Sequence, residues 1–254
     1  MKALITGASS GMGRDMANYL ASFGYDLIVV SRDKKKLDEL FNDLNVSVKK
    51  IEMDLSITDN CIKLHKMLKD ENIDILINNA GFGDAGNFSE TSLDKELNMI
   101  DLNIKAYHIL TKLFLKDFIK KDYGRILNVA SMAGFMPGPY MATYYATKNY
   151  VLKLTMAINE ELRQSGSNVV VSALCPGPVN TNFNKVAMGE FSIKEASPKY
   201  VAEYAIDKMF KKKMIIVPTL RIKLGIFLLR LIPYRLQLIY CYHIQGKKLG
   251  IKKK

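Results

Sequence analysis

Short apolar runs alternate along the chain with longer segments in which apolar residues recur at helical spacing. The runs cover residues 2–6, 26–31, 46–53, 73–80, 125–131, 168–174 and 214–218. Several are almost continuously apolar, as parallel strands are when helices cover both faces of their sheet. No internal repeat or Pro/Gly/Ser-rich linker divides the chain. We therefore expect a single-domain α/β fold with a doubly wound, seven-stranded parallel sheet and helices on both faces.

Charge is distributed unevenly along the chain. The 254 residues include 37 Lys and Arg and 25 Asp and Glu, and residues 211–254 contain twelve of the cations and none of the acids. Residues 1–210 are therefore formally neutral, which argues against a nucleic-acid-binding protein. We expect a folded domain over residues 1–219 and a basic, apolar extension over residues 220–254.

Cysteine and histidine residues give no metal or disulfide pattern. The three cysteines, Cys61, Cys175 and Cys241, have no paired spacing, and the three histidines are isolated from one another. These patterns predict neither a disulfide framework nor a metal site. The first residues lack the basic start and long apolar run of a secretory signal, so we expect a cytoplasmic protein.

Glycines follow the first strand run directly. The segment TGASSGMG places Gly7, Gly11 and Gly13 between that run and the helical pattern RDMANYLASFG. A glycine turn lets the backbone approach a pyrophosphate, and the N-terminus of the next helix favours its charge. The spacing differs from the common G-x-G-x-x-G, so the loop alone fits either a dinucleotide site or a tight turn.

Further motifs follow the glycine-rich loop in a fixed order. They are NNAG at 78–81, Asn103 in DLNIKA, Ser131 in NVASMAG, a Y-x-x-x-K from Tyr144 to Lys148, and PGPVNT at 176–181. Together these motifs, which extend from residue 2 to residue 181, resemble those of the short-chain dehydrogenases and reductases. The resemblance implies a Rossmann-type fold, a nicotinamide dinucleotide and interconversion of a carbonyl and an alcohol by hydride transfer. It also implies a homodimer or homotetramer.

The same resemblance implies catalytic roles for Asn103, Ser131, Tyr144 and Lys148. Tyr144 would exchange a proton with the substrate oxygen, Ser131 would hydrogen-bond that oxygen, and Asn103 would hold a water linked to Lys148. The ammonium of Lys148 would bind the nicotinamide ribose and lower the tyrosine pKa from about 10 toward neutrality. Cofactor contacts are expected from Gly7, Ser9, Ser10, Gly11, Met12, Gly13, Ser31, Arg32, Asp54, Leu55, Asn79, Ala80, Gly81, Tyr144, Lys148, Pro176, Gly177, Val179 and Thr181.

Two adjacent tyrosines precede Lys148. At about 100° per helical residue, both lie near the lysine around the helix axis, and Tyr144 is slightly closer than Tyr145. The family pattern places the acid four residues before the lysine, so we assign Tyr144 to that role. We expect Tyr145 to face a packing surface or a subunit contact.

The end of the second strand run bears on the choice between NADP and NAD. It carries Ser31 and Arg32 where NAD-preferring relatives place a carboxylate. An arginine can pair with the 2′-phosphate of NADP, so we expect NADP, with NAD as the alternative. Asp33 either contacts the ribose or caps the helix that begins KKKLDEL. Asp54 either contacts adenine or is an ordinary residue at a strand end.

The loops expected around the substrate are apolar. They contain Phe82, Met132, Phe135, Met136, Pro137 and Tyr140, and residues 182–198 match the family's mobile lid. Unless these side chains are core or subunit contacts, they predict a lipid-, steroid- or ketoacyl-like carbonyl or alcohol as substrate. A sensor or scaffold that binds a dinucleotide without turnover is the alternative function, although it would not need the four catalytic residues together.

The extension is apolar but interrupted by Arg221, Lys223, Arg230 and Arg235. These cations leave no run long enough to span a bilayer. Apolar runs between cations suit the surface of an anionic membrane, so peripheral contact with the inner face of a membrane through residues 220–254 is one interpretation. The other is that residues 224–232 and 236–244 form helices over the substrate site or a neighbouring subunit, with Pro233 at the bend.

Overall fold

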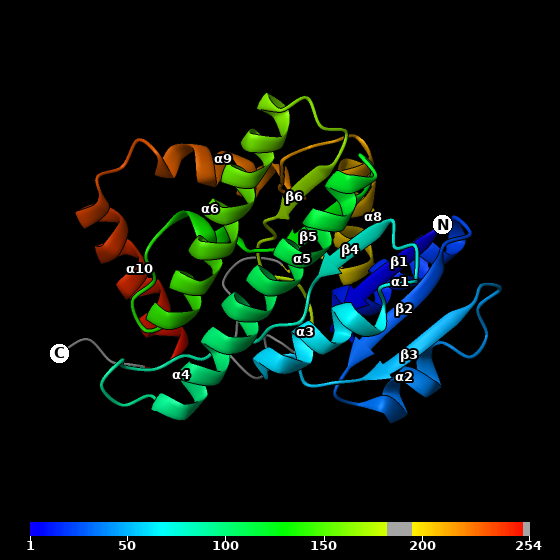
Figure 1. Ribbon diagram of the computed structural model, residues 1–254. Coiled ribbons are helices and arrows are strands. Elements are labelled where there is room, and N and C mark those ends of the chain that lie inside the picture. Colours follow the sequence, from blue (N-terminus) through cyan, green and yellow to red (C-terminus); the bar gives the residue numbers. More distant parts are fainter. Residues whose placement is uncertain (182–194, 251–254) are drawn as a thin grey trace.

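The computed structural model describes residues 1–181 and 195–250. Its seven strands form one parallel sheet in the order β3-β2-β1-β4-β5-β6-β7, as Figure 1 shows. The strands are β1 (Lys2–Thr6), β2 (Asp26–Ser31), β3 (Val48–Glu52), β4 (Ile75–Asn78), β5 (Arg125–Val129), β6 (Val170–Leu174) and β7 (Ile215–Ile216). Each lies within one of the seven predicted runs, so the predicted fold class is confirmed.

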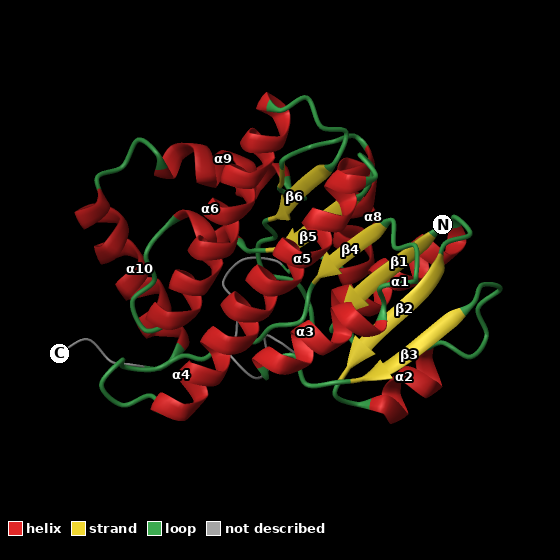
Figure 2. Cartoon of the chain, viewed as in Figure 1, coloured by secondary structure: helices red, strands yellow, loops and turns green. Residues whose placement is uncertain are grey.

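Helices cover both faces of the sheet, as Figure 2 shows. They are α1 (Gly11–Ser22), α2 (Lys34–Leu40), α3 (Thr58–Met67), α4 (Leu93–Ile100), α5 (Tyr107–Lys120), α6 (Ala142–Gln164), α8 (Pro198–Phe210), α9 (Leu220–Leu229) and α10 (Tyr234–Lys248). A π-helical segment, η1 (Asp101–Ala106), joins α4 to α5, and a short 3-10 turn, η2 (Met132–Phe135), follows β5.

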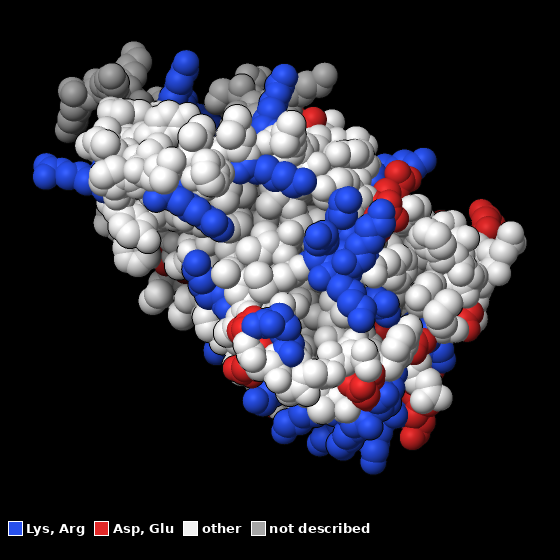
Figure 3. Space-filling model, turned by 90° about the horizontal axis from the view of Figure 1, so that it is seen from above, with Lys and Arg blue, Asp and Glu red and all other residues white. Residues whose placement is uncertain are grey.

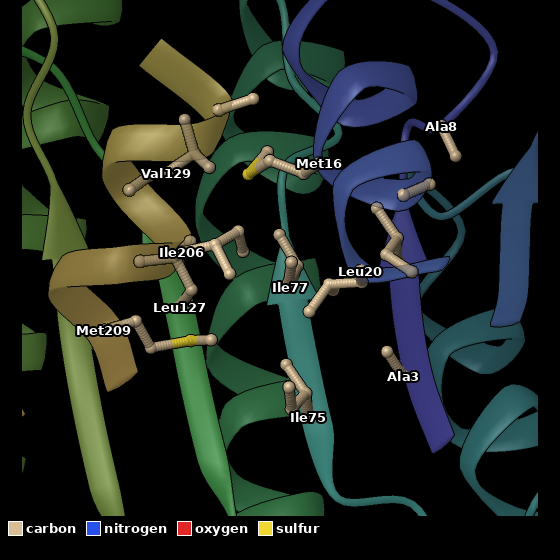
Figure 4. Packing of buried hydrophobic residues seen from close by; sticks show 14 of the residues in the cluster. Ala3, Ala8, Met16, Leu20, Ile75, Ile77, Leu127, Val129, Ile206 and Met209 are labelled. Atoms are coloured by element: carbon tan, nitrogen blue, oxygen red, sulfur yellow. The ribbon is translucent and has the colours of Figure 1, made fainter. Parts of the chain in front are cut away.

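Alternate strand residues build two hydrophobic cores, one on each face. On one face, α1 and α8 pack against the sheet, and Figure 4 shows Leu20 beside Ile77 and Met209 beside Leu127. On the other face, α3, α5 and the C-terminal half of α6 cover a second buried cluster that includes Leu76. Because both faces of the inner strands are buried, those strands read as continuous apolar runs rather than as an alternating pattern.

The order in which the chain adds strands reverses at β1. This strand pairs with β2 on one side and with β4 on the other. In a doubly wound sheet such a switch point leaves a crevice beyond the carboxyl ends of the two strands. Strands β4 and β5 stop earlier than their predicted runs, since β4 ends at Asn78 and β5 at Val129. Asn79, Ala80 and Ser131 therefore lie in the loops at this edge rather than within the sheet.

The extension forms two helices, α9 and α10, that meet at Pro233, and they lie on the opposite side of the molecule from β3 in Figure 1. The Gln237 amide fixes the bend by donating to the backbone oxygens of Leu229 at 2.9 Å and Ile232 at 2.7 Å. Helices on either side of Pro233, which were one of the two interpretations of the extension, are thus present, although α9 ends at Leu229 rather than at residue 232. In the described part of the chain, no helix has the length and apolarity needed to cross a membrane. All three cysteines are free and buried.

Candidate active site

A cavity of about 1320 Å³ follows the carboxyl edge of the sheet from the loop after β1 to helices α9 and α10. This volume exceeds the range of about 300–1000 Å³ that is usual for a site holding one small molecule. Its wall includes every residue expected to contact the cofactor except Gly13, and it includes Ser131, Tyr144 and Lys148. Asn103 lies behind the wall. The fold thus brings nearly all of the predicted site residues to one space.

The loop after β1 is locked onto the loop after β4. The Asn79 amide donates to the backbone oxygens of Thr6 and Gly7, each at 3.0 Å. Gly7 has a φ of +67°, and a Cβ atom there would lie 2.8 Å from the Cα atom of Ala80. A Cβ atom on Gly13 would lie 2.3 Å from the oxygen of Gly7. Gly13 therefore supports the loop from behind, which explains why it does not line the cavity.

The N-terminus of α1 faces the cavity. Its N-cap residue, Ser10, makes no side-chain capping hydrogen bond, and no acidic residue lies in the first turn. The first N–H groups of a helix have no partner within the helix and carry a partial positive charge. Gly11, with a φ of +53°, begins the helix. These features fit the pyrophosphate of a dinucleotide.

Arg32 lies at the rim of the cavity above the end of β2, and its side chain is 65% exposed. Its guanidinium group lies 3.9 Å from a carboxylate oxygen of Asp54, a long and solvent-exposed contact that contributes little to holding it in place. Ser31 donates a hydrogen bond from its hydroxyl to that of Ser9 at 2.8 Å. The rim therefore offers one cation and two hydroxyls next to the glycine-rich loop.

Asp33 caps α2, which is one of the two roles left open by the sequence. Its carboxylate accepts a hydrogen bond from the backbone N–H of Lys36 at 3.1 Å, and this contact lowers its pKa. Asp33 is not part of the cavity wall. Asp54 lines the cavity and also accepts a hydrogen bond from the backbone N–H of Ser56 at 2.9 Å, and its contact with adenine stays a prediction.

Helix α6 presents Tyr144 and Lys148 on the same side, one turn apart, beneath the loop that follows β5. The Ser131 hydroxyl hydrogen-bonds Tyr144 and also accepts from a backbone N–H of η2 at 3.1 Å. The ammonium of Lys148 donates to the backbone oxygen of Val129 at 2.9 Å and lies 5.9 Å from the centre of the Tyr144 ring. Two hydroxyls and one ammonium thus converge at the centre of the cavity.

Burial is the largest influence on the pKa values of Tyr144 and Lys148. It raises the pKa of Tyr144 to about 12, against a smaller lowering by the Ser131 hydrogen bond, and it lowers the pKa of Lys148 to about 8. The predicted shift of the tyrosine pKa toward neutrality is therefore wrong for this structure. The physical reason is that burial removes the phenolate from water, and this effect outweighs the lowering of the pKa by the Ser131 hydrogen bond.

Asn103, in η1, fastens the loop after β4 to α6. Its side-chain oxygen accepts from the backbone N–H of Phe82 at 3.1 Å, and its amide donates to the Phe82 oxygen at 2.8 Å and to the Thr147 hydroxyl at 3.2 Å. A Cβ atom on Gly81 would lie 2.8 Å from the Asn103 oxygen. π-Helical segments often occur at functional sites. The link from Asn103 through water to Lys148 stays a prediction.

Tyr145 differs from Tyr144 in the partner of its hydroxyl. The Tyr145 oxygen accepts a hydrogen bond of 2.7 Å from the amide of Gln245 in α10, and burial raises its pKa. Its ring rests on Gly138, where a Cβ atom would lie 2.3 Å from the ring. Tyr145 therefore packs against the extension of its own chain, although it also lines the cavity.

The substrate end of the cavity is only partly as expected. Phe82, Met132 and Met136 line it, whereas Phe135, Pro137 and Tyr140 do not. The ring of Tyr140 instead packs against Tyr242 of α10 with 4.9 Å between centroids. The predicted lid at 182–198 falls mostly on residues 182–194, outside the described residues, and α8 begins at its end, Pro198.

The extension supplies wall residues that the motifs do not indicate. They are Arg221, Ile222, Gly225, Ile226, Leu228, Leu229, Ile232, Leu236, Gln237, Tyr240, Cys241, Ile244, Gln245 and Lys248. The signal that could indicate them is the apolar character of residues 224–232 and 236–244, which gave a position over the substrate site as one interpretation. In the structure, residues of α9 and α10 line the same cavity as Tyr144, as that interpretation expects.

Known proteins resemble this chain in sequence and in structure. Residues 1–189 match a family model described as short chain dehydrogenase. A very-long-chain 3-oxoacyl-CoA reductase from Neurospora crassa is 34% identical over 218 residues, which are 82% of this chain and 64% of that protein. A short-chain dehydrogenase from Sphingobium yanoikuyae in complex with NADPH has a TM-score of 0.79 and 30% identity, covering 86% of this chain and 88% of that one. A short-chain dehydrogenase/reductase from Burkholderia phymatum in complex with NAD has a TM-score of 0.83 and 25% identity, covering 93% and 95%.

Proposed function

Because this chain belongs to the short-chain dehydrogenase family and is therefore an NAD(P)-dependent oxidoreductase, we propose that it uses NADP to interconvert a carbonyl and an alcohol on a hydrophobic substrate. The observation that carries the proposal is that one cavity contains both the expected cofactor residues and the expected catalytic residues. One end meets the glycine-rich loop and the N-terminus of α1, and its centre meets the hydroxyls of Ser131 and Tyr144.

The residues at the centre of the cavity would handle the substrate oxygen. A bound nicotinamide supplies or accepts the hydride. Tyr144 keeps its proton at neutral pH because burial raises its pKa to about 12, and the protonated phenol is the form that can donate to a carbonyl oxygen. Ser131, already hydrogen-bonded to Tyr144, orients that oxygen. Lys148 binds the ribose, and Asn103 holds the loop that borders it.

The preference for NADP rests on the charges at the rim. Arg32 is the cation next to the glycine-rich loop, and the nearest acidic residue in sequence, Asp33, is engaged as the cap of α2. A charge-assisted hydrogen bond contributes about 1.5–3 kcal/mol, so Arg32→Ala should raise the Kd for NADPH on the order of 10- to 100-fold. The Kd for NADH, which lacks the 2′-phosphate, should change little. Nucleotide fluorescence titration measures both, and equal losses for the two nucleotides would contradict the assignment.

The substrate class rests on the apolar lining beyond Tyr144. Met132, Met136, Ile226 and Leu229 are among the side chains there. The Neurospora crassa relative is named for very-long-chain 3-oxoacyl-CoA, which supports a lipid- or ketoacyl-like substrate for this chain as well. An apolar wall offers few partners for the hydroxyls of a sugar, and burying such groups without hydrogen bonds is costly.

The proposal is tested by following NADPH and NADH oxidation with hydrophobic ketones, aldehydes and quinones. Wild type, Tyr144→Phe and Tyr145→Phe form the matched set, because the two substitutions remove one hydroxyl each from adjacent residues. Loss of an acid–base group typically costs about 10²–10⁴-fold in rate, so Tyr144→Phe should lose turnover by that factor and Tyr145→Phe should keep it. Loss of turnover in Tyr145→Phe with turnover retained in Tyr144→Phe would assign the acid to Tyr145 instead. NADPH binding without turnover across the panel would favour the dinucleotide-binding sensor.

A further inference from the structure

The outer faces of α9 and α10 expose large apolar side chains to solvent. The most exposed are Leu220 at 80%, Tyr234 at 73% and Leu231 at 70%. Leu224 and Phe227 are also exposed on α9. We call the exposed side chains of α9, of α10 and of the turn between them, within residues 220–242, the extension surface. A contiguous apolar surface of this kind marks a site of interaction with a protein or a membrane.

Cations lie among these apolar side chains, and acids do not. Arg221, Lys223, Arg230 and Arg235 are exposed, and within the described residues none of them forms an ion pair with a carboxylate. Residues 211–254 contain no Asp or Glu. Figure 3, in which the extension lies on the left, shows separate blue side chains on a mostly white surface there, while most of the red lies elsewhere.

The inner faces of α9 and α10 pack against the rest of the domain. Ile222 and Ile226 of α9 are buried in a cluster on the domain, and Cys241 and Gln245 of α10 pack on Tyr145. The apolar outer faces therefore cannot turn inward without losing these contacts. Their exposure is a property of the folded chain rather than of a loose tail.

The cavity opens at this surface. Leu228, Ile232, Leu236 and Tyr240 line the cavity and are also exposed to solvent, so they form its mouth. Tyr144 lines the same cavity farther in. An apolar path thus leads from the extension surface toward the hydroxyls proposed to bind the substrate oxygen.

The charges decide between two occupants. A symmetric contact with a second copy through this surface would repeat the same patch on both sides and place cations near cations without any acid from residues 211–254. An anionic bilayer provides both the missing charges and an apolar interior for the leucine, phenylalanine and tyrosine side chains. The surface therefore fits a lipid surface better than a second copy.

We propose that the extension surface seats this protein on an anionic lipid bilayer, and that hydrophobic substrate passes from the bilayer into the cavity through the mouth formed by Leu228, Ile232, Leu236 and Tyr240. The first part stands on the surface alone. The second part rests on the proposed oxidoreductase function, because it assigns the substrate of that site to the membrane phase.

Co-sedimentation of the full chain with vesicles tests the first part. The two vesicle types are phosphatidylcholine alone and phosphatidylcholine with 30% phosphatidylserine. Each Lys or Arg near an anionic surface contributes about fivefold in affinity, so Arg230→Gln/Arg235→Gln should weaken binding to the anionic vesicles about thirtyfold. Leu224→Ser/Phe227→Ser should weaken it on the order of tenfold or more. Lys63→Gln/Lys66→Gln removes the same charge from exposed positions of α3 and should leave binding within about twofold of wild type.

Several results would overturn the membrane assignment. One is absence of wild-type binding to the anionic vesicles, and another is an equal loss in the α3 control. A third is a wild-type dimer in sedimentation velocity that Leu224→Ser/Phe227→Ser converts to a monomer while vesicle binding is absent, since a second copy would then cover the surface. All four substituted positions of the extension are exposed and lie outside the cavity wall, so circular dichroism should report wild-type folding.

The entry route is tested by comparing a long-chain ketone dissolved in the anionic vesicles with water-soluble butanone. The two extension variants should lose NADPH oxidation with the vesicle-borne ketone in proportion to their loss of binding and retain their rate with butanone. Equal rates of wild type and variants on the vesicle-borne ketone would refute entry from the bilayer. Vesicle binding without turnover of either ketone would contradict the oxidoreductase proposal alone.

Discussion

Lys148 should make the folded protein more stable as the pH rises, and replacing Lys148 should abolish this contribution. The side chain is 4% exposed, and burial lowers its pKa from the ordinary value of 10.5 to about 8. An unfolded chain therefore binds this proton more tightly than the folded chain does. Stability then rises with pH between about 8 and 10.5, and the full cost of burying the charge is present below about pH 8.

The magnitude follows from the two pKa values. At pH 6 the buried ammonium costs about 3 kcal/mol, and at pH 9.5, where the unfolded lysine is still mostly protonated but the folded one is not, it costs about 1 kcal/mol. Wild type should therefore gain about 2 kcal/mol relative to Lys148→Met between these two pH values. Val129 keeps a hydrogen-bond donor in the variant, because the Tyr107 hydroxyl also reaches its oxygen at 3.3 Å.

Urea unfolding at pH 6 and pH 9.5 measures the free energy of unfolding of wild type and of Lys148→Met. The prediction concerns how the difference between the two proteins changes with pH. A loss of packing that is the same at both pH values therefore cancels. Lys153→Met is the matched control, because Lys153 lies on the same helix but is exposed. It should follow wild type at both pH values. Parallel profiles for wild type and Lys148→Met would refute the reasoning that this lysine is held in a low-dielectric site.

Three further outcomes are expected. Gly13→Ala places a Cβ atom 2.3 Å from the Gly7 oxygen, so it should displace the loop and abolish NADPH binding in a fluorescence titration, whereas unchanged affinity would show that the loop can shift freely. Gln245→Leu removes the donor to the buried Tyr145 hydroxyl and should lower the free energy of unfolding by about 1–3 kcal/mol, while its addition to a Tyr145→Phe background should cost less than half as much; additive losses in a double-mutant cycle would contradict that coupling. Burial raises the pKa of Cys175 to about 12, so iodoacetamide at pH 8 should modify it only after unfolding in urea, and mass spectrometry of the native protein should find it unmodified.

The fold and the centre of the site could be predicted because local patterns determine them. Buried strands read as apolar runs, and their order gives the sheet. The motif residues Asn79 and Ser131 follow strands, and Tyr144 lies in the first turn of a helix that begins at the same edge, so chain order alone brings them together. The role of Asp33 was left open because a cap and a ribose contact use the same carboxylate at the same position.

Contacts between distant segments could not be predicted in this way. Gln245 hydrogen-bonds Tyr145 across 100 residues of sequence, and no local spacing marks such a pair. Tyr140 was expected in the substrate pocket, but it has a φ of +64° and packs on α10. The direction of the Tyr144 pKa depends on how much water the fold excludes, and the spacing of Tyr144 and Lys148 carries no information about that.

The catalytic residues lie in the part of the chain that matches the family, and much of the cavity wall lies in the extension. This separation bears on how substrate selectivity can evolve. The match to the family ends at residue 189, whereas α9 and α10, which form much of the cavity wall, begin at Leu220. Mutation of the extension can therefore reshape what enters the cavity while Ser131, Tyr144 and Lys148 keep their neighbours. A lineage could exchange one substrate for another by mutation of this segment alone, and a chimaera that carries the corresponding segment of a relative would be the laboratory form of the same step.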